Sequence, residues 1–198
     1  LLIALFDICF AIGESAVITL VFPSGSRSLG MGEVGTALAD DESVIFYNPA
    51  GLAIENSRWK GGAFTVFTEP LLPAFTLPEL WHTHIAGCYQ SPFSTLGGFG
   101  FDLNYLNMGI NEYIDEFGKV IAKTHSYEMV WALSWGTDLF NTGRHLTGCN
   151  LKWIYSALAP GIGPKGEGVA QGYAIDIGYL MQINRPLRLG LTAMNMGP

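Results

Sequence analysis

A glycine pattern near the N-terminus has the spacing of a nucleotide-binding turn. Residues 30–35 read Gly-Met-Gly-Glu-Val-Gly, which is GxGxxG. In dinucleotide-binding proteins this motif follows a strand directly and opens a helix within a βαβ unit. Here residues 23–29 separate the motif from the preceding apolar run, and no parallel-sheet pattern follows it. We therefore expect no dinucleotide cofactor at these glycines.

Other residues of ligand-binding types also lack the required spacing. The acidic triplet at residues 40–42 matches no calcium loop, and His82 and His84 share a strand face without an evident third metal ligand. The glycine-rich loop at 161–168 lacks the order of a phosphate loop. No Ser/His/Asp or Cys/His constellation stands out. The sequence therefore predicts a protein that is not an enzyme and that holds neither a metal nor a cofactor.

A set of charged residues is the most informative polar feature. They occur one each on successive strand-like runs, on the side that carries small residues: Asp102, Glu128, Lys152, Asp176 and Arg188. A charge removed from water is costly unless it is paired or hydrated. We therefore expect these charges to face the lumen of the fold. Asp176 is expected to pair with Lys152 and with Arg188 across neighbouring strands; the alternative is that lumen water hydrates each charge singly.

The segments that carry these charges alternate with a period of two residues. From Tyr127 to Gly136 the odd positions are mostly large and apolar, and the even positions are mostly small or polar. The same division recurs at residues 99–105, 173–181 and 187–192, and less cleanly at 59–67, 81–89 and 150–156. Strict alternation is the signature of a strand with two different faces. The sequence thus predicts seven strands and an all-β fold.

Two architectures would use such strands differently. In a soluble sandwich the bulky face packs against a second sheet, and the other face is solvated and rich in charged residues. In a transmembrane β-barrel the bulky face meets lipid, aromatic residues mark both interfaces, and the small or polar face lines the lumen. The small face here carries Gly, Ala and Ser with few charges, and Tyr127 and Trp135 end one run. These features favour an antiparallel transmembrane β-barrel.

The predicted connections favour the same architecture. Their expected ranges alternate long and short: 68–79, 90–96, 107–126, 137–145, 157–171 and 184–186. Bacterial outer-membrane barrels have long extracellular loops, short periplasmic turns and an even number of strands. An open sheet edge cannot face lipid, because its backbone groups would lack partners. We therefore expect the seven strands to be the N-terminal half of a larger barrel.

The composition of the chain argues against several other classes of protein. The chain has 198 residues, of which 49% are hydrophobic and 14% charged, and its net charge is −7. The 10 basic residues form no stripe, which argues against nucleic-acid binding. No uninterrupted apolar run reaches the length of about 18–20 residues that a spanning helix needs. Residues 1–16 resemble the end of a signal peptide, which predicts export; a buried strand or helix is the alternative.

Residues 17–57 differ in character from the strands that follow. The stretch 26–43 is rich in small side chains, and Asn48-Pro49-Ala50-Gly51 is a strong turn sequence. Small side chains allow backbones to approach closely, as a segment folded into a barrel mouth requires. We predict such a plug, whose motif residues are Gly30, Gly32, Asn48, Pro49 and Ala50; a loose periplasmic tail is the alternative.

These residues also carry a family resemblance. The run SRSLGMGEVGTALADDESVIFYNPAGL, residues 26–52, resembles the N-terminal signature of the PorV/PorQ family, within the FadL-like superfamily. Weaker matches occur at 111–118, 127–129, 152–156 and 187–197, so the resemblance spans residues 22–198. It implies a fourteen-stranded barrel with an N-terminal segment at or inside its periplasmic mouth. Residues 58–198 would form the first half of that barrel.

The resemblance also implies a function. PorV proteins belong to the type IX secretion system, where they receive exported cargo by its C-terminal signal domain and pass it to surface-attachment machinery. The implied partners are outer-membrane lipid, secretion-system proteins and cargo signal domains, and the implied location is the bacterial outer membrane. FadL proper implies the alternative, which is transport of hydrophobic small molecules. A soluble β-sandwich binding module is a third possibility, from a different class.

Overall fold

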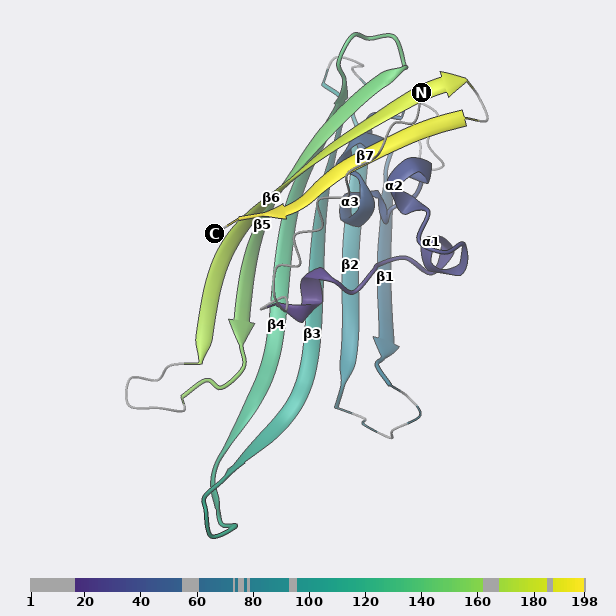
Figure 1. The fold of residues 1–198 in the computed structure, drawn as a ribbon. Helices are drawn as coiled ribbons and strands as arrows, with labels where there is room; N and C mark the ends of the chain where they lie inside the picture. The colour runs from purple at the N-terminus through teal and green to yellow at the C-terminus, as the bar shows by residue number, and fades with distance from the viewer. Residues whose placement is uncertain are drawn as a thin grey trace, which may run out of the picture.

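Seven antiparallel strands in sequence order make up a single curved sheet (Figure 1). The computed structural model describes residues 17–54, 61–72, 74, 77, 79–92, 96–161, 168–184 and 187–197, so the expected signal peptide at 1–16 lies outside the described residues. The strands are β1 (Ala63–Pro70), β2 (Trp81–Gln90), β3 (Gly98–Ile114), β4 (Val120–Asp138), β5 (His145–Ala157), β6 (Val169–Asn184) and β7 (Leu187–Met196). The predicted antiparallel all-β fold is confirmed, and β1 and β7 form the edges of an open sheet.

The two faces of the sheet differ in exposure as the sequence alternates. On β4, Val130 and Ala132 are buried, whereas the side chains between and beside them, Trp131 and Leu133, are 42% and 67% exposed. The same alternation runs along β3, β5 and β6. The bulky apolar side chains therefore occupy the outer face of the curve. No second sheet covers that face within the described part of the chain.

Residues 17–54 contain five short helical elements, most of which pack on the inner face of the sheet. They are η1 (Ile18–Leu20), α1 (Ser26–Gly30), α2 (Gly35–Leu38), α3 (Val44–Tyr47) and η2 (Pro49–Ala53). Figure 1 shows α2 and α3 inside the curve near β7, and α1 beside the edge strand β1. Leu52 and Ile45 of this segment pack with Ala86, Leu146 and Leu180 of the strands in the main apolar core. We call residues 17–54 the N-terminal segment.

None of the helices in the described ranges has the length and apolar content needed to span a bilayer.

The connection between β3 and β4 corrects one prediction from the sequence. We expected a long loop at 107–126, but β3 continues to Ile114, β4 begins at Val120, and the two strands pair through most of this range. The pairing register shifts between Asn107 and Gly109, and Gly109 has φ 76°. Such a bulge breaks the period of two, so the strands could not be recognised from alternation. The expected alternation of long and short connections therefore fails here, because only residues 115–119 join the strands.

Candidate functional site

Four glycines form a continuous row across the inner face. Gly98, Gly136, Gly148 and Gly178 are register partners on the consecutive strands β3, β4, β5 and β6. Glycine interrupts a strand unfavourably, because it has no side chain to pack and loses more backbone entropy on folding. Four glycines in register therefore require an explanation. The explanation is the close approach of the N-terminal segment to the sheet.

The backbone of η2 lies directly on this glycine row. A Cβ atom added to Gly148 would come within 2.4 Å of the carbonyl carbon of Pro49, and one on Gly136 within 2.5 Å of Pro49 O. At Gly98 the obstacle would be Leu52 O at 2.2 Å. Backbone atoms cannot swing aside as a flexible side chain can. A larger residue at Gly98, Gly136 or Gly148 would therefore separate η2 from the sheet.

Asn48 fixes the turn on this row. Its Oδ1 accepts a hydrogen bond from Ala50 N at 3.1 Å, which caps η2, and Pro49 follows at the first helical position. Its Nδ2 donates to Thr36 O at 2.8 Å and to Tyr179 O of β6 at 3.2 Å. The buried side chain of Asn48 thus connects the turn with α2 and with strand β6 of the sheet.

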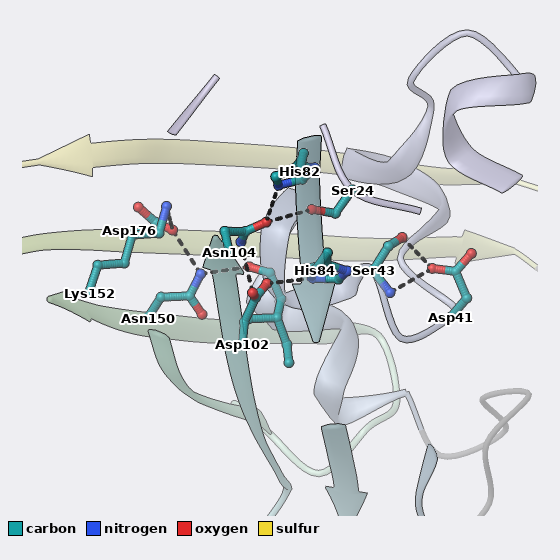
Figure 2. Close-up of polar contacts among 11 residues, drawn as sticks. Ser24, Asp41, Ser43, His82, His84, Asp102, Asn104, Asn150, Lys152 and Asp176 are labelled. Atoms are coloured by element: carbon teal, nitrogen blue, oxygen red, sulfur yellow. Dashed lines mark hydrogen bonds and ion pairs between the residues drawn. The ribbon is translucent and has the colours of Figure 1, made fainter. Parts of the chain in front are cut away.

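A second group of contacts lies on β2 and β3 (Figure 2). His84 Nε2 donates to Asp102 Oδ2 at 3.0 Å, and His82 Nε2 donates to Asn104 Oδ1 at 3.1 Å. Ser24 of the N-terminal segment donates to the same amide oxygen at 3.2 Å. Ser24 and His82 thus share Asn104 Oδ1 as their hydrogen-bond acceptor. The described residues contain no group of three or more His, Cys, Asp or Glu side chains that could hold a metal.

The third group lies on β5–β7. Lys152 Nζ is 2.8 Å from Asp176 Oδ2, and the two side chains are 7% and 0% exposed. Asn150 Nδ2 also donates to Asp176 Oδ2, at 2.8 Å, and Asn195 N donates to Oδ1 at 2.7 Å. Figure 2 shows Asn150 and Lys152 together at this carboxylate. The expected cross-strand pair between Lys152 and Asp176 is therefore present.

Glu128 on β4 connects the sheet to the start of the N-terminal segment. Its Oε2 accepts hydrogen bonds from Thr19 N at 3.0 Å and from Thr19 Oγ1 at 2.8 Å. Its Oε1 accepts from Ser156 Oγ at 3.1 Å. Glu128 is 1% exposed, and these hydrogen bonds compensate for the water that it loses.

Arg188 does not take its expected place beside Asp176. It lies opposite Gln182 in the register of β6 and β7, and its Nη1 donates to Leu38 O of α2 at 2.7 Å. The last residues of β7 bring Asn195, not Arg188, to the Asp176 carboxylate. The predicted Asp176–Arg188 pair is therefore wrong, because the register of β7 is displaced from the one that sequence spacing suggested.

The remaining motif residues divide into two groups. Asn48, Pro49 and Ala50 are buried against the sheet. Gly30 and Gly32 are exposed, and a Cβ atom added to either would meet nothing within 4 Å. Gly32 has φ 79°, a left-handed backbone conformation that glycine adopts without strain, just after the end of α1.

The acidic triplet at residues 40–42 lies beside a basic side chain. Arg27 Nη1 contacts Asp40 Oδ1 at 2.6 Å and Asp41 Oδ2 at 3.2 Å. The hydrogen bond to Asp40 is the largest cause that raises the pKa of Arg27. The carboxylates of Asp40 and Asp41 thus have a cation from within the N-terminal segment.

The sequence analysis missed most of the residues that join the N-terminal segment to the sheet. Gly136 and Gly178 lie on the small face of predicted strands, but Gly148 lies outside the strand expected at 150–156, and alignment of the glycines into a row depends on the register. Thr19, Ser24 and Asn150 carried no signal, because isolated Ser, Thr and Asn residues are common on any surface. A search for glycines near the same end of successive strands could have found the row.

Tyr47 in α3 is a buried titratable side chain of the N-terminal segment. It is 5% exposed, and its hydroxyl oxygen has no hydrogen-bond partner among the described residues. Burial raises the pKa of Tyr47 to about 12, and the charges of Glu33 and Asp41 add to the shift.

Alkaline pH should therefore destabilise the protein through Tyr47. Below the ordinary pKa of 10.0 the phenol is neutral in both states. Above it the unfolded state ionises first, so the free energy of unfolding falls by about 1.4 kcal/mol per pH unit until the folded pKa is reached. At pH 8 the Tyr47→Phe variant should have the same melting temperature as the parent. At pH 11 its melting temperature should be higher than that of the parent, measured by circular dichroism. An identical dependence of both proteins on pH would contradict this assignment.

A comparison with protein-family models finds none that matches this chain, and a comparison with curated proteins finds no match either.

Proposed function

We propose that this chain forms the first half of a FadL-like outer-membrane β-barrel, whose N-terminal segment is a fixed plug. The first support is the outer face. Its side chains are large and apolar on every strand from β3 to β7, and they include Phe101, Trp131 and Ile177, which are 40%, 42% and 52% exposed. Such a surface is unfavourable in water and suits acyl chains.

Aromatic rings at two levels along the strands give the second support. The rings of Trp81, Tyr105, Tyr127 and Tyr155 follow one another across β2–β5, with centroid separations of 5.3, 5.8 and 5.9 Å. Trp135 lies eight residues beyond Tyr127 on β4. That separation is about 27 Å along a strand, or about 20 Å across a bilayer at a tilt of about 40°. The apolar band of outer-membrane barrels measures about 25 Å.

The two open edges give the third support. Each of β1 and β7 has one strand neighbour in the described sheet. Unpaired backbone groups are not tolerated in lipid, so a membrane location requires further strands between these edges. The resemblance to PorV/PorQ supplies the expected number, fourteen.

For the role of the barrel we propose PorV-like, non-catalytic transfer of exported proteins in type IX secretion. The observation that carries this choice is the contact between η2 and the glycine row. Since Pro49 and Ala50 lie on Gly148 without room for a Cβ atom, the lumen has no pathway between them and β5. A plug held in this way suits a protein that offers its outside surface to partners, and it does not suit an open conduit.

The experiment uses the full-length protein in detergent and in lipid vesicles. A purified type IX C-terminal signal domain should bind saturably, and an exported protein without that domain is the control. The vesicles should not admit a radiolabelled long-chain fatty acid faster than empty vesicles do. Absence of signal-domain binding would reject the proposed role, and the membrane proposal would be rejected separately if the protein stayed soluble without detergent.

One observation favours the alternative, transport of hydrophobic small molecules. A cavity of about 290 Å³ lies beside η1, and Val17, Leu20, Ile154 and Ala174 contribute apolar walls to it. Uptake of the fatty acid without binding of the signal domain would select this second function.

A further inference from the structure

A second, much smaller cavity lies beneath the N-terminal segment, between two of the buried polar groups. The space open to the centre of a water molecule is about 10 Å³. In this measure about 10–15 Å³ accommodates one water molecule. Its polar lining residues are Thr19 of η1, Asp102, Asn104 and Lys152, and its apolar lining residues are Leu20, Ile45, Phe46, Val130 and Ala132.

The strand register explains why space remains here. Asp102, Ala132 and Lys152 are cross-strand neighbours on β3, β4 and β5. An acidic and a basic side chain therefore flank a methyl group, which is too short to fill the gap above β4. Figure 2 shows the two groups that result, Asp102 with His84 and Lys152 with Asp176.

The polar walls retain hydrogen-bonding capacity toward this space. Lys152 Nζ contacts Asp176 Oδ2 at 2.8 Å and Asn195 Oδ1 at 2.7 Å, and an ammonium group has three N–H donors. Within the described residues, one of these donors thus has no assigned acceptor. Asp102 accepts one bond on each oxygen, from Asn104 at 2.8 Å and from His84 at 3.0 Å. A carboxylate offers about four acceptor sites, so it can accept more.

We propose that one ordered water molecule binds in this cavity, accepts a hydrogen bond from Lys152 and donates one to Asp102. A metal cation does not suit the site, because the ammonium group of Lys152 would repel it. A larger solute exceeds the volume. The water makes the polar network continuous from His84 on β2 to Asn195 on β7, beneath the N-terminal segment. This inference concerns the interior alone and holds whether or not the proposed secretion role is correct.

The test is a crystal structure of the full-length protein at about 1.8 Å resolution or better, supported by two isosteric variants. Density for one water should lie within hydrogen-bond distance of Lys152 Nζ and Asp102. Ala132→Thr places a hydroxyl where the water binds, and Ala132→Val places a methyl group there. The valine variant should melt lower than the threonine variant by about 2–4 °C or more.

Ala122 on the same strand provides the matched control. It is partly exposed and lies in the projecting part of the β3–β4 hairpin, away from the cavity. Its threonine and valine variants should melt alike. The proposal is overturned if the density contains no water between Asp102 and Lys152. It is also overturned if the two Ala132 variants differ no more than the two Ala122 variants. The parent structure decides the matter if the Ala132 variants do not fold.

Discussion

Gly148→Val is expected to lift residues 48–53 from the sheet and to destabilise the protein by about 3 kcal/mol, the upper part of the range for overpacking. The added Cβ would lie 2.4–2.6 Å from three backbone atoms of Pro49 and Ala50. Because backbone cannot adopt another rotamer, η2 must move as a unit. That movement breaks the hydrogen bonds of Asn48 to Thr36 O and Tyr179 O.

The measurement is hydrogen exchange of the peptide that contains residues 44–54, with thermal melting in detergent. In the parent, Ala50 N donates to Asn48 Oδ1 and should exchange slowly. In Gly148→Val the same amide should exchange at a rate close to that of an unprotected peptide. Gly172→Val is the matched control, because Gly172 lies on β6 and an added Cβ meets nothing within 4 Å. Equal protection of the peptide in both variants would show that the glycine row does not hold the segment.

Removal of one partner of the Lys152–Asp176 pair should have an effect of similar size. Asp176→Leu would leave the ammonium group of Lys152 buried with Asn195 Oδ1 as its remaining described contact. Breaking a buried ion pair in this way costs about 3–5 kcal/mol, because the remaining charge loses both its partner and water. Lys152→Met should cost less, since Asn150 Nδ2 and Asn195 N still donate to the carboxylate.

The double variant distinguishes a lost pair from a lost fold. Lys152→Met combined with Asp176→Leu contains no buried charge at this place, so it should be more stable than Asp176→Leu alone. The readout is the urea midpoint of the full-length protein in detergent micelles. Strict additivity of the two single effects would mean that the two charges are not coupled in the folded state. Glu116→Gln, at the exposed β3–β4 turn, serves as a control for the loss of one carboxylate charge.

The sequence determined the strands and the two faces of the sheet. Alternation from Tyr127 to Gly136 determined which side chains share a face, because the period of two is a local property of an extended backbone. The pairing of Lys152 with Asp176 was also accessible, since both residues fall on the small face of neighbouring strands. The turn at Asn48-Pro49 could be recognised because its residues have strong local preferences.

Only the tertiary structure decided register and the contacts that depend on it. Arg188 faces Leu38 O and not Asp176, and the bulge before Gly109 carries β3 and β4 through a range that lacks clean alternation. The glycine row has meaning only once Gly98, Gly136 and Gly148 are aligned and the backbone of η2 lies on them. Register and docking are set by contacts between residues far apart in the chain, whose free energy no single segment contains.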